Sequence, residues 1–123
     1  MKYVKVVIGI GAVVVVGLVL VVACYVGGRS AARSAAASIA LGETLTALGP
    51  ADPQYGQRLQ HPQKDEILVH SAYEDVVFLS PTNLQFELIL ENTRDESIQL
   101  VPIGVEVVLT VRGWSVVGYG TGG

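Results

Sequence analysis

The chain opens with one long apolar run that no charged residue interrupts. Between Val6 and Val26 it holds valine, isoleucine, leucine, glycine and alanine, with Tyr25 near the end. The hydrocarbon core of a bilayer is about 30 Å thick, and roughly 20 helical residues at 1.5 Å each are enough to cross it. We therefore predict that residues 1–28 form a transmembrane signal anchor. The predicted protein crosses the membrane once.

The charges beside this run bear on its orientation. Lys2 and Lys5 precede it and Arg29 and Arg33 follow it, so the positive charges on its two sides are nearly equal and the positive-inside rule hardly favours either orientation. A short basic head before a long apolar run resembles an uncleaved signal sequence. We therefore expect a cytoplasmic N-terminus and an extracytoplasmic β-rich domain.

Cys24 has two interpretations. The sequence Val21-Val22-Ala23-Cys24 resembles a lipobox, where a signal peptidase cleaves before a cysteine that is then lipidated. Against this, the apolar run continues through Tyr25 and Val26, which favours a cysteine inside a helix. Cys24 is also the only cysteine, so a disulfide framework and a cysteine-based metal site within one chain are excluded.

The next segment predicts a helical stalk. Residues 29–48 are rich in alanine, the best helix former, so the membrane helix is expected to continue into water. Leu41, Leu45 and Leu48 form a narrow apolar stripe at helical spacing. We expect this stripe to be an interface with the β-rich domain or with a neighbouring subunit.

A change of composition then predicts a linker. Gly49 and Pro50 are expected to end the helix, because glycine suits the position after a helix and proline cannot continue it. Residues 49–65 contain more proline, glycine and glutamine, which is typical of an extended linker or a loop on a surface. His61 and His70 lack the carboxylate or cysteine spacing of a metal site.

From residue 66 onward the hydrophobic pattern changes to a period of two. Apolar residues alternate with polar ones over 84–91, and the same alternation recurs over 105–112. The expected strands are 67–73, 76–79, 84–91, 98–101, 105–112 and 115–119, with Pro102 at an edge or bulge. Frequent short strands separated by turns predict a small all-β, immunoglobulin-like antiparallel sandwich over residues 66–123.

These strands resemble a known family. The alternating strand Asn83–Asn92 and the ending Val117-Gly118-Tyr119-Gly120 are similar to the first half of the late-embryogenesis-abundant (LEA) type 2 domain, also called the water-stress and hypersensitive-response domain. Asn92 is followed by Thr93-Arg94, where the family often has Pro-Asn. The resemblance implies an antiparallel sandwich behind a membrane anchor, without catalytic residues. A sandwich short of strands would leave an open edge for a partner strand.

A second resemblance concerns the architecture. One N-terminal apolar helix followed by a small β-domain resembles an archaeal type IV pilin, in which the helices bundle into a filament core and the β-domains coat it. Only Met1–Lys5 precede the apolar run here, whereas pilins lose a short leader ahead of it.

Composition and motifs narrow the function. The chain has 11 acidic and 8 basic residues and a net charge of −3, which disfavours nucleic acid as a partner. No nucleophile elbow, P-loop, zinc-protease or haem motif is present, so we expect no enzyme, no cofactor and no metal. Trp114 follows Gly113 in a candidate turn, where it could anchor an interface, rest on the membrane or cap the core.

We therefore predict a membrane-anchored structural or interaction protein. It would be an accessory subunit of a membrane or cell-surface assembly and would pack through its β-domain. Its expected partners are membrane lipid and other protein subunits or copies of itself. The alternatives are an archaeal pilin-like filament subunit and a stress-protective membrane protein of the LEA type.

Overall fold

The computed structural model describes residues 2–46 and 48–120, without the side chains of residues 2–4 and 71–73. Met1 of the predicted anchor and residues 121–123 of the predicted β-rich domain lie outside this description. The elements in chain order are α1 (Lys2–Ala40), β1 (Thr44–Leu45), β2 (Gly49–Pro50), α2 (Pro53–Arg58), the 3-10 turn η1 (Lys64–Glu66), β3 (Ile67–Ser80), β4 (Asn83–Asn92), β5 (Val101–Thr110) and β6 (Gly113–Gly120).

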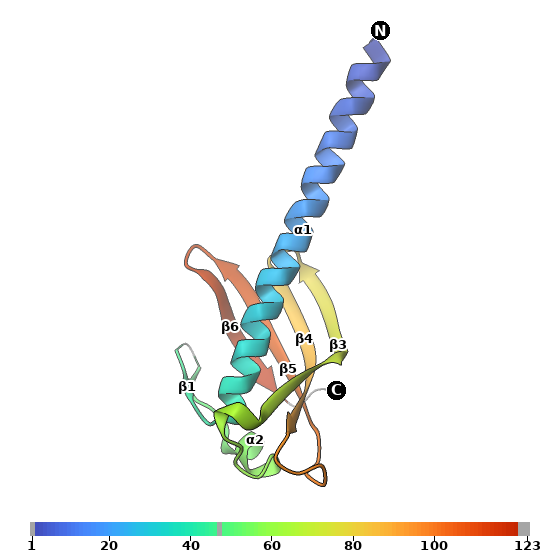
Figure 1. The fold of residues 1–123 in the computed structure, drawn as a ribbon. Coiled ribbons are helices and arrows are strands. Elements are labelled where there is room, and N and C mark those ends of the chain that lie inside the picture. Colours follow the sequence, from blue (N-terminus) through green and yellow to red (C-terminus); the bar gives the residue numbers. More distant parts are fainter. Residues whose placement is uncertain (1, 47, 121–123) are drawn as a thin grey trace.

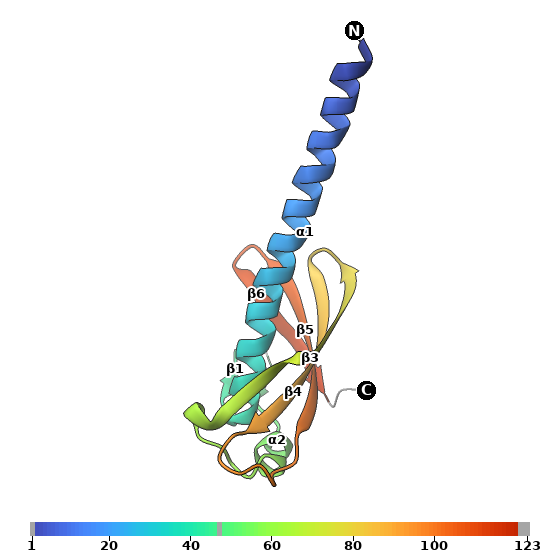
Figure 2. The same cartoon turned by 45° about the vertical axis from the view of Figure 1, so that its right-hand side comes forward.

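Helix α1 has two halves with different surroundings. Its N-terminal half projects alone, and every residue from Lys5 to Ala23 is exposed (Figure 1). Its C-terminal half crosses one face of the main β-sheet, as Figures 1 and 2 both show. By length and composition α1 can span a membrane. The helix continues without a break from the predicted anchor into the segment predicted as a stalk.

The main sheet is a four-stranded antiparallel meander in the order β3-β4-β5-β6. The period-of-two pattern in β4 is confirmed, because its inward-facing side chains Leu84, Phe86, Leu88 and Leu90 are all buried. The two strands expected over 67–79 are one strand, β3, whose register with β4 shifts between His70 and Asp75. The two hairpins, β3–β4 and β5–β6, both turn at the end of the sheet from which α1 projects (Figure 1).

Helix α1 covers the inner face of this sheet. Its buried residues recur at helical spacing and, apart from Ile39, are small: Gly28, Ala32, Ala35, Ala36, Ile39 and Ala40. Short side chains let the helix backbone approach the sheet closely. The antiparallel β-region is confirmed, but the immunoglobulin-like sandwich is not, because a helix takes the place of the second sheet. The alanine-rich segment is therefore part of the core rather than a separate stalk.

The end of α1 corrects the predicted helix stop. Gly42 has a φ of +74°, its N–H donates to the Ile39 carbonyl over 3.1 Å, and the Glu43 N–H donates to the Ser38 carbonyl over 3.0 Å. These two bonds make a Schellman motif, which satisfies the last free carbonyls of a helix. The helix therefore ends at Ala40 rather than at the Gly49-Pro50 pair.

The segment predicted as a linker is packed against the domain. The Asp52 carboxylate accepts a hydrogen bond from the Gln54 N–H over 3.0 Å and caps α2. The side chains of Tyr55 and Leu59 are buried among the residues of the core. Residues 49–65 thus close the end of the domain opposite to the projecting helix, where α2 lies in Figure 1.

Asn92 connects this segment to β4. Its side chain is fully buried, its Nδ2 donates to the Leu59 carbonyl over 2.8 Å, and its Oδ1 accepts from the Arg94 N–H over 3.0 Å. Asn92→Ala should lower the free energy of unfolding by about 2 kcal/mol, because a buried carbonyl would lose its donor. Urea titration of the chain in detergent micelles, followed by circular dichroism, measures this loss.

Thr93→Ala is the matched control for this prediction. Thr93 lies beside Asn92, and its hydroxyl donates to the Glu66 carbonyl over 3.0 Å at an exposed position. Water can replace that bond, so the control should lose less than about 1 kcal/mol. Equal losses in the two variants would contradict the role assigned to Asn92.

Candidate functional site

The end of the domain nearest the projecting helix carries exposed apolar side chains. They lie next to the turns of the β3–β4 and β5–β6 hairpins and are Phe78, Leu79, Leu109 and Val111. Val111, at the turn of the β5–β6 hairpin, is completely exposed. The two hairpin tips lie on either side of α1 where it leaves the domain (Figures 1 and 2). We call residues 78–82 and 109–112 the hairpin tips.

Aromatic contacts fix the position of α1 along its axis relative to these tips. The Tyr25 ring lies between Phe78 and Phe86, with ring centroids 6.3 and 6.0 Å away. Trp114 packs against Gly27 and Gly28, and a Cβ on Gly27 would overlap its Nε1 atom. Tyrosine and tryptophan are enriched where a transmembrane helix meets the aqueous phase. The domain therefore begins immediately where the uncharged run ends.

The tips extend beyond this level. Val111 lies two residues past Leu109, the cross-strand partner of Trp114, which adds about 7 Å at 3.3 Å per residue. That distance equals about four residues of α1. Val21 is 39% exposed, the lowest value among the large apolar residues of the projecting half. The tips thus reach alongside the last turn of the apolar run.

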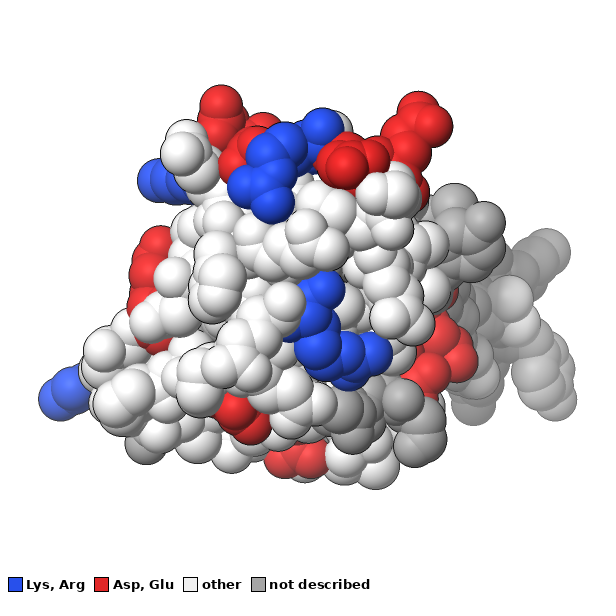
Figure 3. Space-filling model, turned by 90° about the horizontal axis from the view of Figure 1, so that it is seen from below, with Lys and Arg blue, Asp and Glu red and all other residues white. Residues whose placement is uncertain are grey.

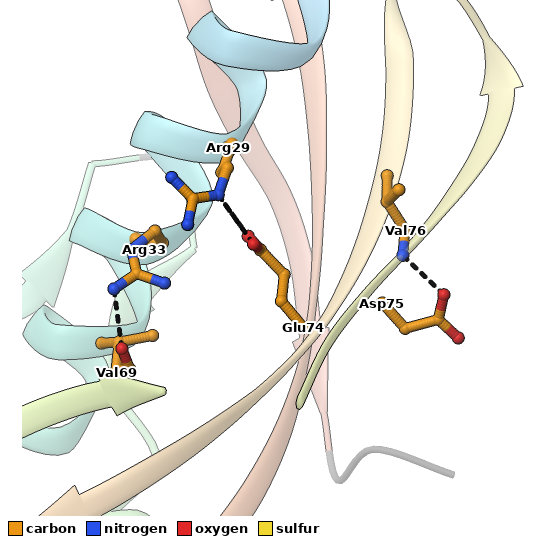
Figure 4. Close-up of polar contacts among 6 residues, drawn as sticks. All are labelled: Arg29, Arg33, Val69, Glu74, Asp75 and Val76. Atoms are coloured by element: carbon orange, nitrogen blue, oxygen red, sulfur yellow. Dashed lines mark hydrogen bonds and ion pairs between the residues drawn. The ribbon is translucent and has the colours of Figure 1, made fainter. Parts of the chain in front are cut away.

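A cavity of about 430 Å³ lies between α1 and β3, just below this level. Its lining residues are Tyr25, Val26, Arg29, Ser30, Arg33 and Glu74. The Arg29 Nε donates to both carboxylate oxygens of Glu74, over 2.9 and 2.7 Å (Figure 4). The Glu74 side chain is only 7% exposed, and this hydrogen bond raises the pKa of Arg29 further above its ordinary value. We call this cavity the arginine cleft.

Arg33 lies one helical turn below Arg29 in the same cleft. Its Nη2 donates to the Val69 carbonyl over 2.6 Å. Its Nη1 is buried and has no hydrogen-bond partner among the described residues. Figure 4 shows the two guanidinium groups on the side of α1 that faces Glu74. Because arginine stays charged in proteins, the cleft holds a buried cationic donor that lacks an acceptor.

The outer face of the sheet, turned away from α1, is acidic. None of the strands β3 to β6 contains lysine or arginine. The strand register places four carboxylates on this face: Asp75, Glu87, Glu91 and Glu106. Two of them oppose each other directly, since Asp75 pairs with Glu87. Like charges at paired positions of a sheet are destabilising. We call these four residues the acidic face.

Neighbouring side chains bind two of the four carboxylates. His70 Nε2 lies 2.9 Å from Glu91 Oε2, and Gln85 Nε2 donates to Glu106 Oε1 over 2.9 Å. Asp75 accepts from the Val76 N–H over 2.9 Å (Figure 4). In the part of the chain that the structure describes, no group of three His, Cys, Asp or Glu residues is placed to hold a metal ion.

The opposite end of the molecule has no comparable feature. Figure 3 looks at the end opposite to the projecting helix and shows lysine, arginine, aspartate and glutamate dispersed among uncharged residues. A mixed surface of this kind is ordinary for a soluble face. Charge of one sign therefore gathers on the outer face of the sheet and not at this end.

The candidate residues from the sequence lie in different places. Cys24 is half-buried in the middle of α1, and Trp114 is half-buried against the glycines of α1. Leu41 and Leu45 are half-buried and Leu48 is exposed; all three follow the end of α1, so they do not form one helical stripe.

Sequence reasoning missed the arginine cleft and the acidic face. Arg29 and Arg33 stand four residues apart after an apolar run, and that spacing places them on one side of a helix. The spacing was the available signal for the cleft. The pairing of Asp75 with Glu87 depends on the irregular register of β3, so no sequence signal marked it.

Compared with known proteins, the chain matches no family model, no curated protein and no solved structure. The resemblances to the LEA type 2 domain and to pilins therefore stay predictions.

Proposed function

We propose that the protein is a membrane-anchored accessory subunit that presents the acidic face of its sheet to a basic partner protein. Helix α1 holds the domain at the bilayer, with the N-terminus in the cytoplasm and the domain outside. The observation that carries this proposal is the opposed pair of carboxylates Asp75 and Glu87 on a sheet face without lysine or arginine. No catalytic reaction is part of the proposal.

The attachment of the domain to α1 supports a presenting role. The C-terminal half of the helix supplies Ala32, Ala36 and Ile39 to the same core as the sheet. A domain joined through its core cannot rotate freely about its anchor. The acidic face therefore keeps one orientation relative to the membrane, as recognition of a neighbouring membrane protein requires.

The charge pattern supports a different chain as the partner. A symmetric dimer brings the same patch of both subunits together, so two acidic faces would oppose each other. Charges in complexes are arranged so that positive meets negative, and like-charge contacts are costly. Lysine or arginine from a partner would relieve the repulsion between Asp75 and Glu87. The acidic face thus favours a hetero-assembly over self-association.

The test is charge reversal on the acidic face. Wild type and Glu87→Lys are gently extracted from their own membrane and weighed by native mass spectrometry. We expect the wild type to carry another polypeptide and Glu87→Lys to lose at least about 90% of it, because one contact changes from attraction to repulsion. Raising the salt concentration should weaken the wild-type complex.

Glu96→Lys is the control for this experiment. Glu96 is exposed in the β4–β5 loop, away from the strands, and its reversal changes the net charge by the same amount. It should leave the complex intact. A wild-type chain that is always recovered alone, or equal losses from both variants, would overturn the proposal.

A pilin-like filament subunit is the second candidate. It is favoured by the exposed apolar half of α1, where a Cβ on Gly9, Gly11 or Gly17 would meet nothing within 4 Å. Such small residues allow a second helix to approach closely. Electron microscopy of cells that express the chain distinguishes the two. Fibres containing the chain would support the filament, and their absence with the chain in the membrane would support the anchored subunit.

A further inference from the structure

We propose that the arginine cleft binds the phosphate of one membrane phospholipid, whose acyl chain lies along α1. The proposal rests on the membrane anchoring proposed above and adds a defined ligand to it. The relevant residues share one side of the helix: Val22, Val26, Arg29 and Arg33 follow one another at intervals of four, three and four. The cleft is lined by the last three of them.

The height of the cleft fits the headgroup layer. A bilayer is about 40–45 Å thick with a hydrocarbon core of about 30 Å, so each headgroup layer measures about 5–8 Å. The uncharged run ends at Val26. At 1.5 Å per residue, Arg29 lies about 4.5 Å and Arg33 about 10 Å beyond that boundary. A lipid phosphate would lie between the two guanidinium groups.

The charges in the cleft fit a phosphate with one negative charge. Two arginines and Glu74 line the cleft, and Glu74 is bound to Arg29. One positive charge remains, on Arg33, whose buried Nη1 has no acceptor among the described residues. A phosphodiester carries one negative charge and has free oxygens that accept from a guanidinium. It would neutralise the positive charge that remains in the cleft.

The walls of the cleft distinguish a lipid from a soluble anion. Tyr25 and Val26 form its membrane side, and the exposed Val22 continues that apolar surface into the bilayer. A phospholipid gains binding free energy from both the apolar and the cationic walls, because its acyl chain contacts the valines while its phosphate contacts Arg33. Free phosphate would gain only the polar contact. The continuity between the cleft and the membrane span therefore favours a lipid.

The experiment uses the whole chain in detergent with phosphatidylglycerol of defined chain length, and native mass spectrometry counts the retained lipid. We expect one lipid per wild-type chain and about tenfold or more weaker retention by Arg33→Gln, because hydrogen bonds between charged groups are strong. Arg33→Lys keeps the charge but loses the planar fork, and it should retain an intermediate amount. Fluorescence of Trp114 verifies that each variant is folded.

Arg112→Gln is the matched control. Arg112 is exposed at the β5–β6 tip, at the same end of the domain but outside the cleft. It loses the same charge and should retain lipid as the wild type does. Equal losses from Arg33→Gln and Arg112→Gln would show a general attraction between charges and would overturn the site.

Two further ligands test the lipid itself. Diacylglycerol has the acyl chains without phosphate, and inorganic phosphate lacks the chains. The proposal would be overturned if the chain retained diacylglycerol as well as it retains phosphatidylglycerol. It would also be overturned if inorganic phosphate abolished lipid retention at equal concentration. Carbonate extraction of the cell membrane tests the anchor separately. A chain that resists extraction but retains no lipid refutes the cleft and leaves the anchored subunit standing.

Discussion

Replacing Gly28 with leucine should lower the free energy of unfolding by about 3 kcal/mol. A Cβ at this position would lie 2.8 Å from Leu84 Cδ1 and 3.4 Å from the Trp114 ring. Both neighbours pack against the core, and Leu84 is fully buried, so neither can move away without disturbing β4 or β6. Thermal and urea unfolding in micelles, followed by the fluorescence of Trp114, would measure the loss.

Gly17→Leu is the control for Gly28→Leu. It makes the same substitution in the same helix, but nothing lies within 4 Å of a Cβ at Gly17. We expect its effect on domain stability to be below about 0.5 kcal/mol. Leu84→Ala combined with Gly28→Leu should recover part of the loss, because it opens the space that the new side chain needs. A double variant that loses the sum of both single effects would contradict direct contact between the two positions.

Phe86→Ala should have an effect of similar or larger size, about 3–5 kcal/mol. The Phe86 ring is fully buried at the centre of β4, and the Tyr25 ring of α1 lies 6.0 Å away. Alanine would leave a cavity where helix and sheet meet and would remove the aromatic contact. The same unfolding measurements apply, and the variant should also show faster amide hydrogen exchange along β4.

Phe78→Ala is the natural comparison for Phe86→Ala. Phe78 also lies beside Tyr25, with ring centroids 6.3 Å apart, but it is 46% exposed in the β3–β4 hairpin. Its loss should cost less than about 1.5 kcal/mol in micelles. If Phe78→Ala and Phe86→Ala lowered the free energy of unfolding equally, the core would not be centred on β4 as the structure indicates.

The sequence predicted the parts of the fold that depend on local pattern. The absence of charge from Val6 to Val26 marked the apolar part of α1, and the alternation along 84–91 marked β4. Alternation shows that one face of a strand is covered, but it does not show what covers it. The cover was predicted to be a second sheet, whereas it is the alanine-rich half of α1. Alanine favours a helix in water and also suits a close contact with a sheet, so composition alone could not separate a stalk from a core helix.

The position at which α1 ends shows a second limit of local reasoning. Gly42 and Gly49 both qualify as residues that end a helix, and Gly49 is followed by proline. The helix ends at Ala40 with Gly42 in its Schellman motif, and Tyr55 and Leu59 then fold back and are buried at the distal end of the core. Burial of those side chains is a tertiary effect that no helix-stop signal contains.

The candidate site was less predictable than the fold. Glu74 binds Arg29 across 45 positions of the chain. The contact requires α1 to lie on the sheet and β3 to change register after His70. Neither condition can be derived from the periodicity of the sequence. The four carboxylates of the acidic face were visible as acids in the sequence, but only the strand register shows that they share one face.

In the membrane-anchored protein proposed above, the continuous helix links the domain mechanically to the surrounding lipid. A transmembrane helix that is longer than the hydrocarbon layer reduces the mismatch by tilting. Because α1 runs unbroken from the bilayer into the core of the domain, any tilt of the span turns the sheet through the same angle. A thinner membrane would thus lower one hairpin tip towards the lipid, raise the other, and re-aim the acidic face. The thickness of the bilayer would then help to decide which neighbour that face can meet.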